Sequence, residues 1–288
     1  MKKIAVLNDL SGLGKCSLTA AIPVISVMGV QACPLPTAVL SAQTGFPSYY
    51  YDDYTEHMEE IMDQWKKMNF HPDGIYTGFL AGDVQAEMAL KFIERFADED
   101  TRILADPILG DNGAAYPIYT ESLCKKMRQL AEKASVVTPN LTEALLLLYG
   151  KEEMHNRWEY LSGLETKKFM IEIQKIGQKI AKGFHTEAVI TGIDLYIDDP
   201  GKAVEMANLI VNDRCQSWVT SKKEGGSYSG TGDLFASVLS AGMVKGMDTV
   251  KTVKKAVKFL SGAIHDTVLE GTDRNEGVCF EKYLGELL

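Results

Sequence analysis

Residues 225–235 read GGSYSGTGDLF, a run of glycines that leads directly into an apolar helical sequence. Glycines let backbone amides converge on one point, and the positive end of the following helix strengthens the attraction for an anion. Asp233 would lie at the mouth of this turn, where a carboxylate is unfavourable unless it accepts a proton from a hydroxyl nucleophile. The alternative is a helix N-cap, since aspartate is a preferred capping residue. The stretch therefore predicts a phosphate-binding turn with a candidate general base.

Around this turn, short apolar strands alternate with helical segments. The clearest helix is 249–269, in which valine, leucine and isoleucine recur every three or four residues. The predicted strands are apolar or β-branched runs at 3–8, 31–36, 73–78, 102–106, 135–138 and 187–191, followed by a more polar pair near 204–211 and 214–219. Strands joined by crossover helices indicate a mostly parallel central sheet flanked by helices. We expect one α/β domain over residues 1–288.

The composition is that of an average globular chain and excludes several classes of protein. Of the 288 residues, 45% are apolar and 24% charged, and the formal net charge is −9, which argues against a nucleic-acid partner. The five cysteines are widely spaced without a CxxC pair, which favours reduced thiols in a cytoplasmic protein over disulfides or a zinc site. No stretch has the length of a signal peptide or a membrane span, so we expect no membrane partner.

Two stretches do not fit the alternation of strands and helices. Residues 43–54, QTGFPSYYYDDY, hold three consecutive tyrosines between turn residues, and residues 150–165 are charged with interspersed aromatics. Either is a lid or a surface connection. For the tyrosines, the alternatives are a flap over a substrate and a half-buried edge strand.

The loop after the first strand, DLSGLGKC at 9–16, has the glycines and the lysine of a P-loop but fails that motif at both ends. The P-loop needs glycine where Asp9 stands and a hydroxyl where Cys16 stands. The dinucleotide-binding fingerprint fails too, because Ser17 replaces its last glycine. What remains is a tight polar loop at the carboxyl end of a strand, where α/β sheets bind ligands. It either touches the substrate or forms a plain turn.

The GTGD sequence at 230–233 resembles the signature of the ribokinase-like superfamily of small-molecule kinases. Three further segments resemble those of its pyridoxal kinase family: SAQTG at 41–45, ADPILGD at 105–111 and VTPNLTE at 137–143. All four occur in the family's order, with similar spacing, between residue 4 and about 270. The resemblance implies a ribokinase-like three-layer sandwich with a small substrate flap.

The resemblance also implies an activity, namely ATP-dependent phosphorylation of the 5′-hydroxymethyl group of pyridoxal, pyridoxine or pyridoxamine. Gly230, Thr231 and Gly232 would form the anion hole, and Asp233 would take the proton from the hydroxyl. Such transfers depend mainly on positioning and charge neutralisation, which these groups can supply. The family positions for the B6 substrate are Asn8, Thr44 and Phe79 beside Asp233, and those for the nucleotide phosphates are Asn140 and Thr191.

The metal sites and the assembly are likewise implied by the resemblance. Asp106 and Glu143 each follow a predicted strand, and their hard oxygen atoms suit Mg²⁺ and its water shell. Their alternatives are turn chemistry for Asp106 and a favourable first-turn helix charge for Glu143. Thr138 and Thr191 match family positions for a monovalent cation such as K⁺, and the family is usually homodimeric.

The chain departs from the typical family pattern at its expected substrate pocket. Asn8-Asp9 replaces Ser-His, and Phe79 stands where tyrosine is common. A negative charge on Asp9 near the pocket would favour a cationic amine, which predicts a preference for pyridoxamine or pyridoxine over pyridoxal. Two alternatives remain: a hydroxymethylpyrimidine (phosphate) kinase, whose family typically reads GTGC where this chain has GTGD, and a non-catalytic B6-binding protein.

Overall fold

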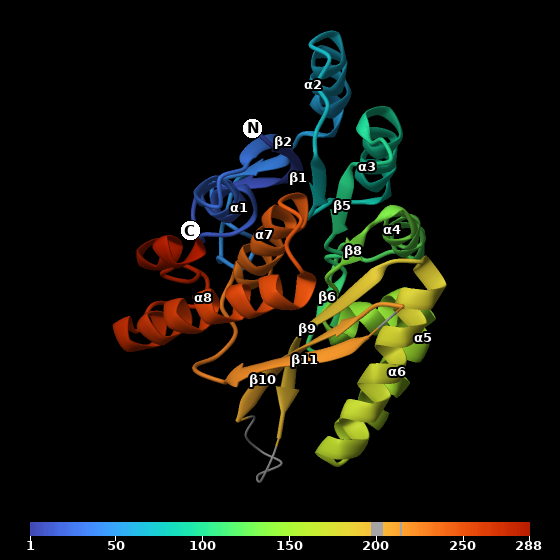
Figure 1. The fold of residues 1–288 in the computed structure, drawn as a ribbon, viewed down its shortest axis with the longest axis vertical. Coiled ribbons are helices and arrows are strands. Elements are labelled where there is room, and N and C mark those ends of the chain that lie inside the picture. Colours follow the sequence, from blue (N-terminus) through green and yellow to red (C-terminus); the bar gives the residue numbers. More distant parts are fainter. Residues whose placement is uncertain (197–203, 214) are drawn as a thin grey trace. The chain divides into compact units, whose positions relative to one another are not determined.

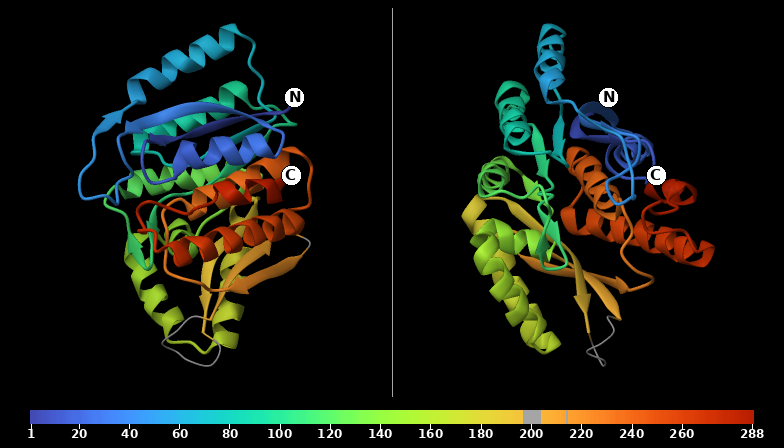
Figure 2. Two further views of the ribbon diagram at one scale, coloured as in Figure 1. Left: turned by 90° about the vertical axis from the view of Figure 1, so that its left-hand side faces the viewer. Right: turned by 180° about the vertical axis from the view of Figure 1, so that it is seen from behind.

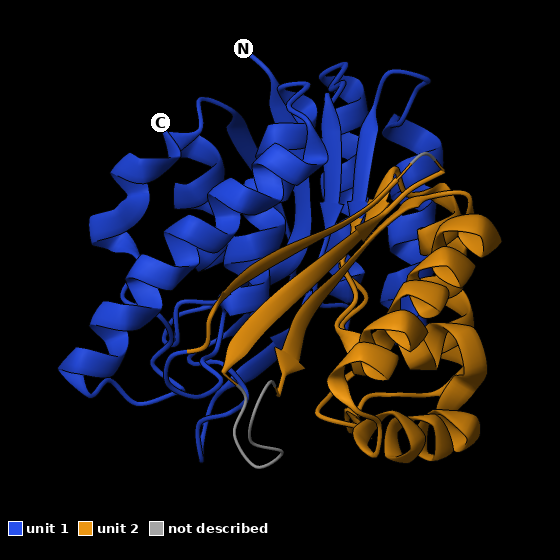
Figure 3. Cartoon of the chain, turned by 60° about the horizontal axis from the view of Figure 1, so that its bottom comes forward, with its two compact units in different colours: residues 1–104, 224–288 blue, residues 105–223 orange. Residues whose placement is uncertain are grey.

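The computed structural model describes residues 1–196, 204–213 and 215–288. Contacts within the chain divide it into two compact units (Figure 3). The first unit combines residues 1–104 with 224–288, and the second comprises residues 105–223. The expectation of a single domain over the whole chain stays a prediction.

The first unit is built on a sheet in which β1 pairs in parallel with both of its neighbours (Figure 1). The spatial order is β5 (Arg102–Ala105), β4 (Gly74–Thr77), β1 (Lys3–Ser11), β2 (Gln31–Leu40) and β3 (Tyr51–Asp53). The edge strand β3 runs antiparallel to β2. In β1, the four residues 4–7 are completely buried, as expected for a strand covered on both faces.

Helices cover both faces of this sheet (Figure 2). One face carries α1 (Ser17–Val27) and α7 (Thr231–Val244), with α8 (Thr249–Glu270) packed on α7, and the other carries α3 (Asp83–Phe96). The remaining elements are α2 (Thr55–Lys67), which contacts α3, and the 3₁₀ helix η1 (Glu281–Leu287), which contacts α8. The helix predicted for 249–269 is present, but its buried face differs from the predicted stripe of valine, leucine and isoleucine. Only Val253 of that stripe is buried, together with Thr252, Ala256, Phe259, Ala263 and Thr267.

The second unit contains a sheet with the spatial order β11 (Gln216–Lys222), β10 (Glu205–Val211), β9 (Glu187–Leu195) and β8 (Val136–Val137). β8 and β9 are parallel, whereas β10 is antiparallel to both of its neighbours. The helices are α4 (Glu121–Lys133), α5 (Leu141–Ser162) and α6 (Thr166–Phe184), and β6 (Gly110–Asp111) and β7 (Ala114–Ala115) form a small hairpin. The predicted α/β class with a mostly parallel sheet flanked by helices is confirmed.

Both stretches with open alternatives are described by the structure, and their role as a lid or flap stays a prediction. Residues 43–50 form turns and extended chain before the edge strand β3, whose residues are all exposed. The charged stretch 150–165 is helical up to Ser162, as the second half of α5 after a break at Gly150. Residue 214, the predicted start of the last strand, lies outside the described residues, and β11 begins at Gln216. No helix among the described residues is long and apolar enough to cross a membrane.

Candidate active site

The α7 helix begins at a glycine whose conformation and surroundings exclude a side chain. Gly230 is the N-cap, with φ +78°, and a Cβ at this position would collide with the carbonyl oxygen of Lys15. Since Gly230 has no side chain with which to cap the helix, the amides of the first turn are left for another partner. A Cβ at Gly232 would meet nothing within 4 Å, so the space beside this amide is open.

Asp233, in the first turn of α7, is buried, with 9% of its surface exposed. Its Oδ1 accepts a hydrogen bond from Asn8 Nδ2 at 3.0 Å and lies 3.5 Å from the Tyr76 hydroxyl. The Ser17 backbone amide also donates to this carboxylate. Burial, and to a smaller degree the charge of Asp9, raise the pKa of Asp233 to about 6, which suits a general base near neutral pH.

Asn8 is fully buried in β1, directly after the buried residues 4–7. Both the oxygen and the nitrogen of its side-chain amide form hydrogen bonds. Its Oδ1 accepts from the backbone amides of Asp9 at 3.0 Å and Phe79 at 2.8 Å. The amide nitrogen must therefore face Asp233, because only the oxygen can accept those two bonds. The structure thus brings together three of the predicted site residues, Asn8, Phe79 and Asp233.

Asp9 is buried as well, with 6% of its surface exposed. Its Oδ2 accepts from Ser11 Oγ at 2.6 Å, and its Oδ1 accepts from Ser17 Oγ at 2.5 Å. Burial raises the pKa of Asp9 even though both serine hydroxyls oppose that change. Each carboxylate oxygen of Asp9 thus has a hydroxyl partner inside the protein, and the preference for a cationic amine stays a prediction.

Thr44 lies in an exposed turn. In the same turn, Gln43 accepts from the Gly45 amide at 2.6 Å and donates to the Asn275 carbonyl at 3.1 Å. No hydrogen bond recorded for the described residues joins Thr44 to Asn8 or Asp233. Its assignment to the substrate therefore stays a prediction.

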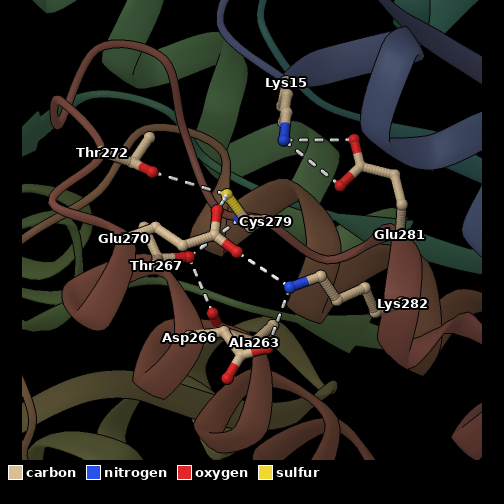
Figure 4. A network of polar contacts seen from close by, with 9 residues as sticks. All are labelled: Lys15, Ala263, Asp266, Thr267, Glu270, Thr272, Cys279, Glu281 and Lys282. Carbon is tan, nitrogen blue, oxygen red and sulfur yellow. Dashed lines mark hydrogen bonds and ion pairs between the residues drawn. The ribbon is translucent and has the colours of Figure 1, made fainter.

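Ion pairs connect the chain after α8 to that helix and to the loop before α1 (Figure 4). Lys282 pairs with Glu270 at 2.8 Å and with Asp266 at 3.3 Å, both on α8. Glu281 pairs with Lys15 at 3.2 Å. Lys15 supplies the carbonyl oxygen beside Gly230, so the C-terminal segment contacts the same loop that borders the N-terminus of α7.

In the second unit, the N-terminus of α5 is closed by a capping box. Asn140 Oδ1 accepts from the Glu143 backbone amide, and Glu143 Oε2 accepts from the Asn140 backbone amide, both at 2.9 Å. Glu143 Oε1 accepts from the Leu109 amide at 3.1 Å. Glu143 has only 5% of its surface exposed, and burial together with the neighbouring charge of Asp106 raises its pKa well above the ordinary value.

The other residues predicted for the metal and the nucleotide lie around this helix end. Thr138 Oγ1 donates to Asp106 Oδ1 at 2.9 Å, and Thr191 forms an isolated parallel bridge with Asn140. Within the described part of the chain, no group of three or more His, Cys, Asp or Glu side chains could hold a metal ion. The oxygen atoms of two carboxylates and a hydroxyl nevertheless suit Mg²⁺, which commonly retains several waters.

Three residues at these sites were not anticipated from the sequence. Tyr76 faces Asp233 from inside a fully buried strand, and Ser17 contacts both Asp9 and Asp233. The Trp158 indole lies against Gly113 in the β6–β7 hairpin, where a Cβ would collide with it. A phenol in an otherwise apolar strand is a signal that could have indicated Tyr76, whereas the other two residues have no comparable signature.

The chain resembles known kinases over nearly its whole length. The model of the phosphomethylpyrimidine kinase family matches residues 14–277. A crystal structure from Bacteroides thetaiotaomicron, of a protein that carries the provisional name phosphomethylpyrimidine kinase and was crystallised with pyridoxal, is 35% identical. It covers 99% of this chain and 95% of its own, with a TM-score of 0.87.

Two more distant proteins extend the comparison. A protein of Schizosaccharomyces pombe with the provisional name pyridoxal kinase is 22% identical over 98% of this chain and 89% of its own length. The pyridoxal kinase of Leishmania donovani, in complex with ADP, is 20% identical, covers 100% of this chain and 96% of its own, and has a TM-score of 0.78. This last similarity concerns the fold.

Proposed function

The chain belongs to the phosphomethylpyrimidine kinase family and is a phosphotransferase, and we propose that it transfers the γ-phosphoryl group of ATP to the 5′-hydroxymethyl group of a B6 vitamer. The predicted resemblance to pyridoxal kinases is confirmed at the level of the family. The observation that carries the proposal is the buried Asp233 carboxylate, with its raised pKa, in the uncapped first turn of α7.

In this proposal Asp233 is the general base. Its pKa of about 6 leaves it mostly ionised at neutral pH, yet basic enough to accept a proton as the hydroxyl oxygen attacks. Asn8 and Tyr76 both donate toward one oxygen, Oδ1, and so hold the carboxylate in a single orientation. A hydrogen-bonded base with a fixed orientation is what in-line attack on a phosphoryl group requires.

The turn from Gly230 to Gly232 would hold the phosphoryl group during transfer. The helix supplies first-turn amides and a positive dipole end, and both favour the charge that spreads over the phosphate oxygens. Thr231 Oγ1 is used inside the turn, where it donates to the Tyr228 carbonyl at 3.1 Å. The backbone of Thr231, rather than its hydroxyl, is therefore the group that we assign to the anion hole.

Asp106, Glu143 and Thr138 would hold Mg²⁺, directly or through its waters. Burial and, after it, repulsion from Asp106 raise the pKa of Glu143, and a cation here would offset that repulsion. When bound, it would neutralise part of the phosphate charge. Asn140 and Thr191 would lie near the nucleotide phosphates, and Thr138 and Thr191 are the candidate positions for K⁺.

The B6 ring would lie near Phe79, which supplies an apolar wall, and near Asn8 and Thr44. Asn8 already donates to Asp233, so its main contribution would be to orient the base. A hydroxymethylpyrimidine (phosphate) kinase is the alternative that the family's name favours. Asp233 argues against this alternative, because enzymes that phosphorylate hydroxymethylpyrimidine typically have cysteine at this position. Homodimer formation and a cytoplasmic location stay predictions.

A substrate panel tests the proposal. The purified protein would be incubated with Mg-ATP and, separately, with pyridoxal, pyridoxine, pyridoxamine and hydroxymethylpyrimidine, and both ADP and the phosphorylated product would be measured. We expect efficient turnover of at least one B6 vitamer. Turnover of the pyrimidine alone would move the substrate to the alternative class, and B6 binding without ADP release would favour a binding protein.

A further inference from the structure

Two strained residues lie where the loop after β1 leads into α1: Lys15 in the loop and Ser17 at the first position of the helix. Lys15 has φ +48° and Ser17 has φ +51°, which is the left-handed region that residues with a side chain seldom adopt. Such conformations persist only where surrounding contacts impose them, and they are concentrated at functional sites. Ser17 has two such contacts, one with Asp9 and one with Asp233.

Ser17 links two buried carboxylates. Its hydroxyl donates to Asp9 Oδ1 at 2.5 Å, and its backbone amide donates to the Asp233 carboxylate. Ser17 and Asp9 each have 6% of their surface exposed, so water competes little for these bonds. The hydroxyl bond is charge-assisted and stronger than a bond between neutral groups, which makes Asp9 an effective anchor.

We propose that Asp9 and Ser17 form a positioning device for Asp233, in which Asp9 holds the Ser17 hydroxyl and thereby keeps the Ser17 amide on the Asp233 carboxylate. This inference rests on the proposed role of Asp233 as the general base. Asp9 and Ser17 are positioning residues, because they act through Asp233 and not on the substrate. The role also gives a physical reason for the aspartate that replaces the typical histidine of pyridoxal kinases at position 9.

The device has two opposing electrostatic effects on Asp233. The Ser17 amide stabilises the ionised carboxylate and lowers its pKa, whereas the nearby charge of Asp9 raises it. The other groups that face Asp233 are the Asn8 amide, the Tyr76 hydroxyl and the Cys16 thiol, whose own pKa is raised to about 12 and which therefore stays neutral. Loss of the Ser17 contact alone should thus raise the pKa of Asp233.

Two matched variants, Ser17→Ala and Ser11→Ala, separate this role from a merely structural one. Each removes one hydroxyl that donates to Asp9, but only residue 17 contacts Asp233. The first readout is the pKa of the Asp233 carboxyl, measured by a ¹³C NMR titration of protein labelled at aspartate. The Asp233 resonance is assigned by its absence from the spectrum of Asp233→Asn. We expect Ser17→Ala to raise this pKa by about one unit and Ser11→Ala to change it by less than about a third of a unit.

The second readout is kinetic. Ser17→Ala should lower kcat for the B6 vitamer about tenfold, leave the KM for ATP within about twofold, and move the acid limb of the pH profile upward with the pKa of Asp233. Ser11→Ala should lower kcat by less than about threefold. If Ser17→Ala does not fold, Ser17→Gly replaces it, because glycine accepts the left-handed backbone without strain and also lacks the hydroxyl.

Equal effects of the two alanine variants on the Asp233 pKa, or a Ser17→Gly variant with wild-type pKa and kcat, would overturn the inference. The NMR titration requires no turnover, so it remains decisive even if the B6 vitamers are not substrates. Conversely, an active Asp233→Asn variant would refute the proposed base while leaving the titration as a test of the contact between Ser17 and Asp233.

Discussion

Asp233 of the first unit and Glu143 of the second unit occupy equivalent places in their helices, but they are bound in different ways. Each is the third residue of a helix, each is buried, and each has a pKa raised by burial and by a neighbouring aspartate. Glu143 is bound by the Asn140 amide at its own helix end and by the Leu109 amide. Asp233 is bound instead by Asn8, Tyr76 and Ser17, which lie far away in the sequence.

The difference shows how a helix N-terminus can serve either structure or chemistry. The capping box uses the first-turn amides of α5 to stabilise the helix itself. In α7 the N-cap is Gly230, and the acidic residue of the first turn is bound by partners on β1, β4 and α1. In the proposed function, the first-turn amides of α7 bind an anionic ligand.

The largest expected effect is that of Asp233→Asn. The variant keeps the shape of the side chain but cannot accept the proton, so kcat for the B6 vitamer should fall about 10²- to 10⁴-fold while the KM for ATP changes by less than about threefold. Steady-state kinetics at saturating Mg²⁺ would measure both.

The same variant should not be less stable than the wild type at pH 7. The pKa of Asp233 is raised, so the native state binds this proton more tightly than the unfolded state, and stability rises as the pH falls from above 6 toward about 4. At pH 7 the ionised carboxylate is thus a cost, which the asparagine removes. A large loss of stability on urea denaturation would show that Asp233 is mainly a structural residue.

The next largest effect is expected for Gly230→Ala, which tests whether the N-terminus of α7 requires glycine at its N-cap. The added Cβ would collide with the Lys15 carbonyl oxygen and would force alanine into a left-handed conformation. We expect a loss of about 1 to 3 kcal/mol in the free energy of unfolding and a fall in kcat of about 10- to 100-fold.

Gly232→Ala is the matched control for the steric part of that effect. It adds the same methyl group two residues further on, where nothing lies within 4 Å, so the free energy of unfolding should change by less than about 1 kcal/mol. If Gly230→Ala were as stable as Gly232→Ala in chemical denaturation, the close approach of Lys15 to this turn would be wrong.

Glu143→Gln tests the role of the carboxylate in the second unit. Glutamine keeps an oxygen for one backbone amide but removes the charge beside Asp106. We expect the Mg²⁺ concentration for half-maximal activity to rise about tenfold, with kcat at saturating Mg²⁺ falling less than in Asp233→Asn. A fall in kcat equal to that of Asp233→Asn, which added Mg²⁺ does not restore, would refute the distinction between the two carboxylates.

The smallest effect is expected at the N-caps of the second unit. Asn140→Ala should cost about 1 to 2 kcal/mol in the free energy of unfolding, because it removes the cap of α5 and a bond to the Gly110 carbonyl. Thr120→Ala, which removes the simple cap of α4, should cost about 1 kcal/mol. Urea unfolding would measure both variants. An Asn140→Ala variant as stable as the wild type would mean that the capping box contributes nothing.

The sequence was sufficient to predict the fold class and the proximity of several site residues. Asn8 lies in the carboxyl-terminal half of β1, and Phe79 follows the neighbouring parallel strand β4. Residues at the carboxyl ends of such strands meet at one edge of a sheet. The capping box was also open to prediction, because Asn140 is followed three residues later by Glu143, the usual spacing of this motif.

Other features depend on tertiary contacts that no local pattern reveals. The binding of both Asp9 oxygens by two serine hydroxyls is one such feature. The left-handed conformation of Ser17 has no sequence signature, since serine rarely adopts it and its partner Asp233 lies far away in the sequence. The contact of Tyr76 with Asp233 joins residues 157 positions apart.

The pH dependence of kcat/KM for the preferred B6 vitamer tests the central role of Asp233 most directly. Activity should fall about tenfold per pH unit below a midpoint near 6, because protonation of Asp233 removes the base, and this limb should be absent from the residual activity of Asp233→Asn. A wild-type profile that stays flat down to pH 4, or an unchanged acid limb in Asp233→Asn, would contradict the account.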